Sequence, residues 1–449
     1  MCWVGLGWQK RRGAGSWKIM HIVPNHGYTT RMMTDTIPLE PNTVRAQFPA
    51  LQQEVNGQLA AFLDGPGGTQ VSQRVIDAMS GYLSRGSSNL GGPFLTSRQT
   101  VETAQEARLA MMDFLNARRP EEIAFGQNMT SLTFAVSRAI SRTWQPGDEI
   151  ILTRLDHDAN ISPWLMAAED REVTVRWLDF RPEDCTLALD SLPELLNERT
   201  RLVAVTYASN AVGSVTDVKR VAELAHETGA LVYVDSVHYA PHGPIDVQDL
   251  DCDFLACSVY KFFGPHQGVL YGKFELMDNL TAYKVRPAPS KPAGKWETGT
   301  QSFESLAGSA AAVNYLAELG GSGADRRQQI VRAMKSIRQY EMGLSDRFLR
   351  GAVNVPGMKV FGITDIESLE HRTPTFAISL EGYSPEEVAT HLGENGVFVW
   401  HGHYYAVEVV KRLGLMDLGG LVRIGFVHYN TSGEVDRVLV DLQNLANEQ

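Results

Sequence analysis

Apolar and polar positions alternate in blocks along residues 60–300. Short, mostly apolar runs predict strands, and longer segments with apolar residues three or four apart predict helices between them. Apolar strands joined through helices are typical of a largely parallel sheet that helices cover on both faces. The predicted strands are Glu122–Phe125, Ile150–Thr153, Thr174–Leu178, Leu202–Tyr207, Leu231–Asp235, Phe254–Ser258 and Val269–Tyr271. The clearest predicted helices are Arg98–Ala117, Ser131–Thr143 and Val218–Thr228.

The pattern changes after Glu297, where a long helical region, Ser305–Arg350, begins the second part of the chain. A β/α section follows, with strands predicted at Thr375–Ser379, Val397–Trp400 and Leu421–Gly425. We therefore expect two domains. The large domain covers residues 61–298 and the small α/β domain covers residues 299–449. We expect the N-terminal segment at residues 33–60 to join the small domain.

Residues 1–32 contain no Asp or Glu but five Lys or Arg. An apolar start precedes these basic residues, which is the reverse of a secretory signal peptide. We expect a disordered leader, or a natural start at Met32 or Met33.

Composition narrows the function classes. The 41 basic and 52 acidic residues give a net charge of −11, which argues against binding to nucleic acid or to an anionic membrane. No apolar run reaches the roughly 18 residues of a membrane-spanning helix. The four cysteines include no CxxC pair, so neither a disulfide framework nor a zinc knuckle is indicated. These features favour a cytoplasmic protein with a small-molecule substrate.

One acid and one lysine stand at the ends of predicted strands. Asp235 closes Leu231–Asp235, and Lys261 follows Phe254–Ser258. The carboxyl ends of strands in an open α/β sheet meet in a ligand crevice. Pyridoxal phosphate (PLP) requires such a pair, a lysine for the Schiff base and an acid opposite the pyridine nitrogen. The alternative is that Asp235 caps a helix and Lys261 is a solvated surface residue.

Four further segments resemble one enzyme family, in order along the chain. DHDANISPW at Asp156–Trp164 resembles the "EHHxNxxPW" segment of the cysteine desulfurase and selenocysteine lyase branch of the class V aminotransferase-fold enzymes. Tyr207–Val218 resembles that family's "SNxxGxxxPV", Trp296–Gly308 its "EAGTxxxxxxxG" and Val422–Val438 its "RASxxxYNTxEEVDxL". The resemblance implies the PLP-dependent transferase fold type I, with a mostly parallel seven-stranded sheet flanked by helices and a smaller α/β C-terminal domain.

The resemblance also implies roles around the cofactor ring. Lys261 would form the internal aldimine and then move protons at the substrate Cα, while Asp235 would keep the pyridine nitrogen protonated. His157 matches the histidine that stacks on the ring. Asn210 matches the asparagine beside the phenolic oxygen and the substrate carboxylate. His238 stands where the desulfurases carry a glutamine that hydrogen-bonds this oxygen.

The cofactor phosphate is expected at a predicted strand-to-helix junction. Asn128, Met129 and Thr130 lie there, and free backbone N–H groups at a helix N-terminus bind anions. Ser258 would add a hydroxyl, as in the family's "SxHK" segment, and Tyr260 replaces the histidine of that segment. The glycine-rich Gly65–Gly68 is interpreted as a turn.

Two further residues concern the substrate and a partner subunit. Arg423 lies where the family binds the substrate α-carboxylate, which the planar guanidinium suits. Thr300 matches the threonine that reaches the PLP phosphate of the neighbouring subunit. The resemblance therefore implies a homodimer with shared active sites.

The chain departs from the desulfurases at their nucleophilic cysteine. Tyr405 falls on the cysteine position of the "RTGHHCA" loop, and no cysteine follows Cys257. A persulfide needs a mobile thiolate, so classical desulfuration is not expected. On this loop His401 and His403 could both face the substrate and act as acid or base, but the favoured interpretation is that they line the active-site loop and bind the substrate.

Several alternatives stay open. His401 and His403 could instead bind zinc with His391 or His428, although no metal motif supports this and we expect no metal. The leading hypothesis is a PLP enzyme that acts on an amino acid through an external aldimine and Cα deprotonation, with the chemistry after deprotonation left open. The resemblance to the selenocysteine-lyase branch implies elimination or lysis at Cβ. A class V aminotransferase or epimerase is the main alternative, and a PLP-binding protein without turnover is a remoter one. Fold alone does not decide among them.

Overall fold

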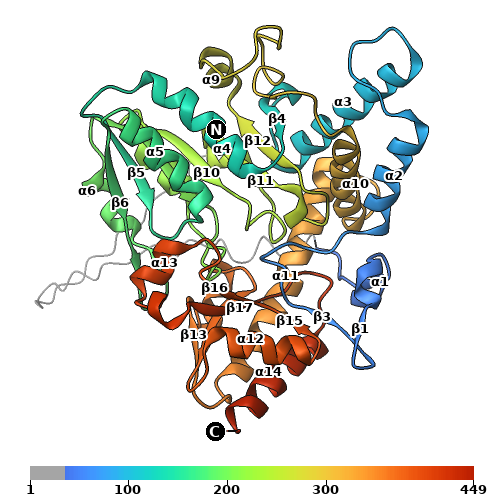
Figure 1. Cartoon of the computed structure of the whole chain (residues 1–449), viewed down its shortest axis with the longest axis vertical. Helices are drawn as coiled ribbons and strands as arrows, with labels where there is room; N and C mark the ends of the chain where they lie inside the picture. The colour runs from blue at the N-terminus through green and yellow to red at the C-terminus, as the bar shows by residue number, and fades with distance from the viewer. Residues whose placement is uncertain (1–35, 449) are drawn as a thin grey trace, which may run out of the picture. The chain divides into compact units, whose positions relative to one another are not determined.

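This computed structural model describes residues 36–448, so the predicted leader at residues 1–32 lies outside the described part (Figure 1). No helix within the described residues is long and apolar enough to cross a bilayer.

A seven-stranded sheet forms the centre of the larger part of the fold (Figure 1). Its strands run in the order β4-β12-β11-β10-β9-β5-β6. Strand β12 is antiparallel to both of its neighbours, and the other neighbouring pairs are parallel. The predicted strands are therefore confirmed, as β4 (Ile123–Gly126), β5 (Glu149–Thr153), β6 (Thr174–Leu178), β9 (Thr200–Thr206), β10 (Leu231–Asp235), β11 (Phe254–Ser258) and β12 (Gly268–Gly272).

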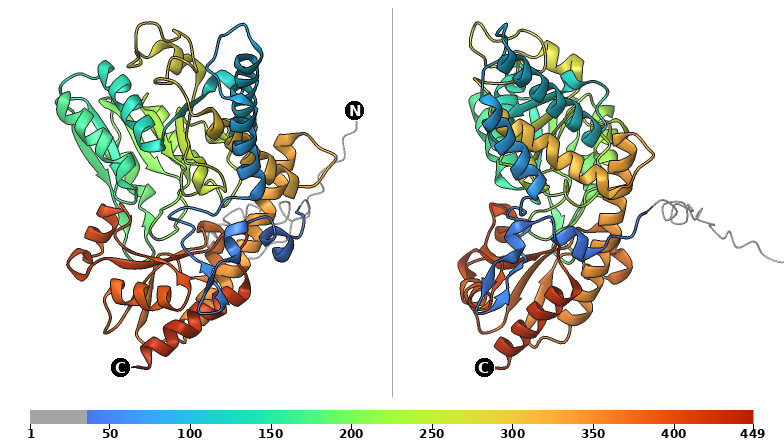
Figure 2. Two further views of the ribbon diagram at one scale, coloured as in Figure 1. Left: turned by 45° about the vertical axis from the view of Figure 1, so that its right-hand side comes forward. Right: turned by 90° about the vertical axis from the view of Figure 1, so that its right-hand side faces the viewer.

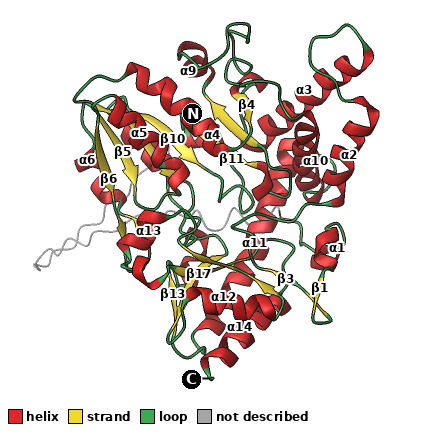
Figure 3. Cartoon of the chain, viewed as in Figure 1, coloured by secondary structure: helices red, strands yellow, loops and turns green. Residues whose placement is uncertain are grey.

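Helices cover both faces of this sheet (Figure 3). Alternate strand residues enter different cores: Ile151 and Val203 pack in the same cluster as helices α3, α7 and α10, whereas Leu152 and Ala204 pack with α4 and α5. Because both faces are buried, the strands are continuously apolar. These helices are α3 (Leu95–Leu115), α4 (Met129–Ile140), α5 (Ser162–Asp170), α7 (Val218–Glu227) and α10 (Phe303–Leu319).

The second part of the fold contains a four-stranded antiparallel sheet in the order β13-β14-β17-β16. A separate hydrophobic core, the third in the fold, packs β14 and β17 against helices α11, α12 and α14. The elements are β13 (Met358–Phe361), β14 (Thr375–Leu380), β16 (Trp400–Gly402), β17 (Leu421–Gly425), α11 (Arg326–Ala352), α12 (Pro385–Glu394) and α14 (Ser432–Ala446).

Two predicted boundaries were wrong. The helical region Ser305–Arg350 is two helices, because the glycine-rich residues 320–324 interrupt it and Asp325 caps the start of α11 by accepting from Gln328 N. The predicted strand Val397–Trp400 is divided, since β15 (Val397–Phe398) pairs with β3 (Ala61–Phe62) while β16 pairs with β17. Helix α2 (Gln73–Gly86) was not predicted.

The remaining elements are short. They are α1 (Pro41–Arg45), β1 (Glu54–Val55), β2 (Gln58–Leu59), β7 (Phe180–Arg181), β8 (Thr186–Leu187), α6 (Leu192–Leu195), α8 (Val247–Leu250), α9 (Phe274–Asn279), α13 (Val407–Arg412), and the 3₁₀ turns η4 (Asp158–Asn160) and η6 (Val259–Lys261) used below.

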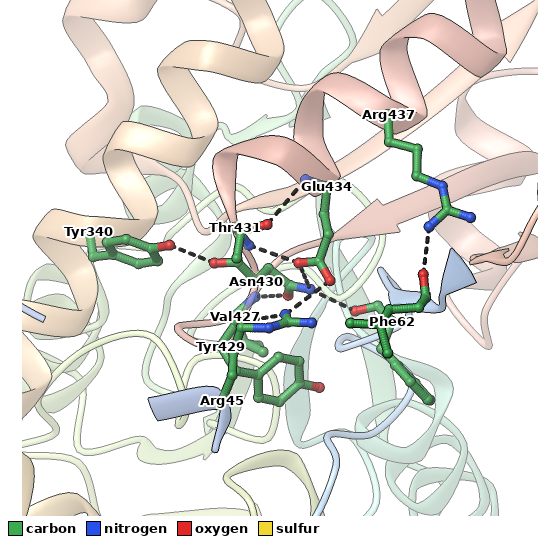
Figure 4. Close-up of polar contacts among 10 residues, drawn as sticks. Arg45, Phe62, Tyr340, Val427, Tyr429, Asn430, Thr431, Glu434 and Arg437 are labelled. Carbon is green, nitrogen blue, oxygen red and sulfur yellow. Dashed lines mark hydrogen bonds and ion pairs between the residues drawn. The ribbon is translucent and has the colours of Figure 1, made fainter. Parts of the chain in front are cut away.

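Residues 41–62 lie beside the C-terminal elements in both views of Figure 2. Asn430 is the centre of this junction: its amide donates to Phe62 O (3.1 Å), and its side-chain oxygen accepts from Val427 N (2.8 Å), as Figure 4 shows. Arg45 donates to Tyr429 O and pairs with Glu434 at 3.0 Å. The YNT segment that resembled the family's ending therefore joins the N-terminal segment to α14.

Candidate active site

A cavity of about 750 Å³ opens at the carboxyl end of the central strands, facing β16 and β17. Every predicted site residue except Thr300 lines it: Asn128, Met129, Thr130, His157, Asn210, Asp235, His238, Ser258, Tyr260, Lys261, His401, His403 and Arg423. Thr300 is exposed and does not line this cavity. The structure thus brings together side chains that are up to about 295 positions apart, as 423 − 128 shows.

Asp235 and Lys261 reach the cavity from adjacent parallel strands. Asp235 ends β10, where it pairs in register with Ala256 of β11, and Lys261 lies in η6 directly after β11. Burial, together with the positive charge of Arg423, lowers the pKa of Lys261 to about 7. A substantial fraction of this amine is therefore neutral near pH 7. Its Nζ donates to Pro66 O.

Asp235 is 4% exposed, and burial raises its pKa to about 6. The Val237 N–H, 2.9 Å from Oδ1, and the charge of Lys261 act in the opposite direction. The carboxylate form is thus available at neutral pH with only one protein hydrogen bond, which leaves it able to accept another.

The segment after β5 fixes His157. Asp156 accepts hydrogen bonds from Asn160 Nδ2 and Thr206 N, and Asn160 accepts in turn from Trp164 Nε1. His157 Nδ1 accepts from Ala159 N at 3.0 Å, so a neutral ring carries its proton on Nε2. Burial lowers the pKa of His157 to about 3, which keeps the ring neutral.

Helix α4 presents its N-terminus to the cavity. Asn128 and Ser131 form a reciprocal capping box, in which Asn128 Oδ1 accepts from Ser131 N at 2.8 Å. The backbone N–H groups of Met129 and Thr130 have no intrahelical acceptor at these positions, as at any helix start. Gly268 packs directly on the Asn128 backbone, because an added Cβ would lie 2.4 Å from Asn128 C. This side of the cavity suits an anion.

Ser258 and Tyr260 flank Lys261 on the same side. The Tyr260 ring stacks on His266 with ring centroids 4.8 Å apart, and Lys261 Nζ lies 4.9 Å from the Tyr260 centroid. Burial raises the pKa of Tyr260, so its phenol remains a donor.

The predicted turn at Gly65–Gly68 is confirmed, with Gly67 N donating to Asp64 O at 2.7 Å.

Arg423, Asn210 and Tyr404 form a closed group of contacts. Arg423 Nη1 donates to Asn210 O (2.8 Å), Asn210 Nδ2 donates to Tyr404 O (2.9 Å), and the guanidinium lies 4.4 Å from the Tyr404 ring centroid. Arg423 Nε and Asn210 Oδ1 are buried without a hydrogen-bond partner within residues 36–448. Burial lowers the pKa of Arg423 to about 10, so the side chain stays cationic near pH 7.

His238 lines the cavity but is anchored away from solvent. Its Nε2 lies 3.2 Å from Thr373 Oγ1 and 3.0 Å from Thr375 Oγ1. Burial lowers its pKa well below the ordinary value, so the ring is neutral at physiological pH. A neutral imidazole can donate one hydrogen bond without adding charge to the cavity.

The loop between β16 and α13 closes the opposite wall. His401 and His403 are exposed and line the cavity, and Tyr405 N donates to His403 Nδ1 at 3.1 Å. The Tyr405 ring stacks on His157 with centroids 5.4 Å apart. Tyr404 and Tyr405 have φ angles of 51° and 59°, a left-handed conformation that costs roughly 1–2 kcal/mol per residue.

Neither His391 nor His428 lines this cavity, and His428 is buried in contact with Tyr315. Within residues 36–448 no group of three or more His, Cys, Asp or Glu is arranged to hold a metal ion.

A model of the aminotransferase class-V family matches residues 61–438. The chain belongs to the class V aminotransferase family. A cysteine desulfurase from Pectobacterium atrosepticum is 32% identical over 417 residues, which cover 90% of this chain and 97% of the relative. An aminotransferase-like protein from Gibberella zeae is 34% identical over 89% of this chain and 97% of the relative.

Solved structures agree with this assignment. A cysteine desulfurase from Escherichia coli superposes with a TM-score of 0.78 at 28% identity, covering 92% of this chain and 99% of the other. A cysteine desulfurase from Thermococcus onnurineus gives 0.81 at 25% identity, covering 92% and 100%. The fold-type prediction is confirmed, and the chain is a class V enzyme of the PLP-dependent kind.

The three cysteines within residues 36–448 do not reach the cavity of this class V enzyme. Cys185, Cys252 and Cys257 are buried and unpaired, and none lines the cavity. Burial raises the pKa of all three thiols, so they stay protonated. Tyr405 occupies the part of the loop where the desulfurase resemblance places a cysteine.

Sequence reasoning assigned no role to three residues at this site: Asp64, Asp156 and Tyr404. Burial raises the pKa of Asp64 to about 6 and of Asp156 to about 8. Asp156 directly precedes His157 at a strand end, which was a usable signal. The contact of Tyr404 with Arg423 depends on β16–β17 pairing, and no local pattern in the sequence indicates it.

Proposed function

We propose that this class V enzyme binds an α-amino acid and deprotonates it at Cα, with Lys261 as cofactor attachment point and proton carrier. The supporting observation is the placement of Lys261 and Asp235 on adjacent strand ends of one cavity, with the lysine pKa near 7. A neutral amine at this pH can both bond the cofactor and accept a proton.

The residues present fit PLP. PLP supplies an aldehyde that condenses with amines and a ring that withdraws electrons from the substrate Cα. The N-terminus of α4, Ser258 and Tyr260 would hold the phosphate. Asp235 would pair with the pyridine nitrogen, and the neutral ring of His157 would pack on the cofactor plane.

Two neutral donors remain for the phenolic oxygen. Asn210 and His238 line the same side of the cavity, and Asn210 Nδ2 is already bonded to Tyr404 O. His238 would supply the hydrogen bond that the desulfurases obtain from glutamine, with its proton on Nδ1, because Nε2 already contacts the hydroxyls of Thr373 and Thr375. Because its ring is neutral, it adds no charge beside that oxygen.

Arg423 would bind the substrate carboxylate. Within residues 36–448 its Nε is buried without a partner and its Nη1 is bonded to Asn210 O, so the edge formed by Nε and Nη2 has no hydrogen bond to these residues. That edge matches the two oxygens of a carboxylate. With the carboxylate held there, Lys261 on the strand ends of the facing wall would be the base that takes the Cα proton and returns it. His401 and His403 would contact the substrate side chain.

The step after deprotonation is proposed to be lysis at Cβ without an enzyme persulfide. Several relatives are named cysteine desulfurases, but Tyr405 cannot form a persulfide. Incubation with cysteine should give no persulfide on Cys252 or Cys257, whereas a cysteine desulfurase treated in parallel should form one. Transamination is the second candidate, favoured by the relative named an aminotransferase-like protein.

We also propose a homodimer in which Thr300 reaches the partner's phosphate site. Thr300 is exposed, and a second hollow of about 690 Å³ shares Gly67, Tyr260 and Trp400 with the active-site cavity. That hollow is open beside the proposed phosphate site. Apolar side chains on α2, α3 and the segment between them are more than 40% exposed, as an interface requires: Ile76, Leu83, Leu90, Phe94, Leu95 and Val101.

Mixing subunits tests the shared site. A Lys261→Ala subunit paired with a Thr300→Ala subunit should restore one site with full cofactor affinity, because the Lys261-bearing subunit receives the intact Thr300. Finding an active monomer by sedimentation, or no recovery in mixed dimers, would rule out the role of Thr300 in trans.

The unpaired thiols of Cys185, Cys252 and Cys257 fit a reducing compartment, and we therefore expect the protein in the cytoplasm.

The reaction itself is tested with purified protein and a panel of amino acids. Keto acid, ammonia and sulfide are assayed together, since lysis and transamination release different products. Borohydride reduction followed by peptide mapping should place the cofactor on Lys261. Cofactor on another lysine, or no product from any amino acid, would contradict the proposed function.

A further inference from the structure

Tyr404 is held on three sides at the carboxylate end of the cavity. Its phenol donates to Leu421 O, its carbonyl accepts from Asn210 Nδ2, and its ring lies under the Arg423 guanidinium. Burial raises the pKa of this phenol, so the donor persists at physiological pH. We propose that Tyr404 is a positioning residue that fixes the Arg423 guanidinium for the substrate carboxylate. This inference rests on the proposed role of Arg423.

The backbone makes this placement possible. Strand β16 pairs with β17 so that Trp400 lies opposite Arg423 and Gly402 opposite Leu421. The chain then turns through the left-handed Tyr404 at φ 51°, and the side chain returns across β17 toward Arg423. A left-handed tyrosine is unfavourable by itself, so the contacts of its ring, phenol and carbonyl must hold it.

Asp64 could form an ion pair with Arg423 and so compete with the substrate carboxylate. Asp64 lies near enough for Arg423 to lower its pKa, and Asp64 Oδ1 is buried without a hydrogen-bond partner within residues 36–448. Yet the two side chains form no ion pair in the described structure, because Arg423 is bonded to Asn210 O and covered by the Tyr404 ring. If Arg423 rotated onto Asp64, its free edge would be lost to the substrate.

An aromatic ring holds the Arg423 guanidinium in place better than a carboxylate would. A guanidinium stacked on a ring in a desolvated site is attracted to the π face without using any of its N–H groups. A carboxylate in the same place would consume the Nε–Nη2 edge and repel the substrate carboxylate. Tyr404 therefore stabilises the orientation of Arg423 and leaves that edge available.

The test isolates the contribution of the substrate carboxylate to the binding affinity. The cofactor-loaded enzyme is titrated with matched pairs of amines that differ only by the carboxylate: L-alanine and ethylamine, L-phenylalanine and phenethylamine, L-cysteine and cysteamine. Visible absorbance of the bound cofactor gives a dissociation constant for each. The ratio of the amine constant to the amino-acid constant measures the carboxylate contribution.

We expect Tyr404→Leu to reduce this ratio by about 10-fold, because the cation–π contact and the barrier to rotation are both lost. Tyr404→Phe keeps the ring and should stay within about 3-fold of the wild type. Affinity for the plain amines should not change in either variant. Tyr383→Leu is the matched control, since Tyr383 donates to Leu445 O in the C-terminal part of the fold and should leave the ratio unchanged. If Tyr404→Leu does not fold, Tyr404→Met carries the same expectation.

Arg423→Lys distinguishes the positioning role of Tyr404 from the carboxylate-binding role of Arg423. If it removes the carboxylate preference while the Tyr404 variants retain it, Tyr404 does not position Arg423 and only this inference is wrong. If Arg423→Lys leaves the ratio unchanged, or the wild type shows no preference for any amino acid, the proposed carboxylate site itself is wrong.

Discussion

The two walls of the cavity are built in different ways. The lysine wall consists of strand ends in fixed register: Asp235 from β10, Ser258 from β11 and Lys261 immediately after it. The opposite wall is the loop after β16, where two consecutive left-handed tyrosines are held by contacts with Arg423, Asn210 and His157. The lysine wall matches the family's segments, whereas this loop departs from them.

This difference indicates where chemistry and selectivity reside. Register in a buried parallel sheet admits no gradual change, since a shift by one residue moves each side chain to the other face. The groups required for every reaction of the family are therefore expected on the lysine wall. A loop can exchange a cysteine for a tyrosine without disturbing the sheet, so it can select which reaction follows. The predictions below compare the two walls.

The largest effect is expected from Lys261→Ala on the lysine wall. Turnover should fall by more than about 10³-fold, because the variant loses both the proposed covalent attachment point and the proposed proton carrier. Borohydride should no longer label the protein with cofactor. Turnover above that level would mean that another group moves the Cα proton.

Asp235→Asn should reduce turnover on the order of 10²–10³-fold, the size of a lost electrostatic contact at a reacting centre. In the role proposed for Asp235, an amide cannot keep the pyridine nitrogen protonated, although it has nearly the same shape as the carboxylate. Cofactor content, measured by absorbance, should change little. A variant with full cofactor and full activity would remove Asp235 from the electronic role.

The pH dependence of cofactor loading should report the environment of Lys261. Its pKa falls from 10.5 to about 7, and only the neutral amine bonds an aldehyde. The loading rate of the cofactor-free protein should thus rise roughly tenfold between pH 6 and pH 8 and then level off. Arg423→Met removes a neighbouring positive charge, so the midpoint should move to higher pH. A rate that still climbs steeply toward pH 10 would show an unperturbed lysine.

On the loop wall, Tyr405→Ala should cost less than about 10-fold in activity. It removes one aromatic contact with His157, and such pairs contribute roughly 0.5–1.5 kcal/mol. Product identity is the more informative readout, since this wall is expected to contact the substrate side chain. A loss as large as that of Asp235→Asn would place Tyr405 among the reacting groups and erase the distinction between the walls.

The sequence predicted the lysine wall well and the loop wall poorly, for a physical reason. Strand positions such as Leu231–Asp235 follow from local apolar runs, and Asp235 and Lys261 follow from where those runs end. Tyr404 and Asp64 acquire their surroundings from the pairing of β16 with β17 and the isolated bridge between Asp64 and Gly425. The division of Val397–Trp400 between two sheets was missed because both halves have the same apolar pattern.

The smallest effect on activity is expected at the junction of the N-terminal segment with α14, where Asn430 lies. Asn430→Ala leaves Phe62 O and Val427 N without their side-chain partner in a buried place, which should lower the free energy of unfolding by about 2–3 kcal/mol. Activity per folded molecule should stay near that of the wild type, since Asn430 does not line the cavity. Urea denaturation measures the first quantity, and turnover normalised to bound cofactor measures the second. Asn444→Ala, on the exposed side of α14, is the matched control and should change stability by less than about 0.5 kcal/mol. If Asn430→Ala instead lowers turnover per bound cofactor by about 10-fold or more, the prediction is wrong. The position of β17 and Arg423 would then depend on the contact of the N-terminal segment with Asn430.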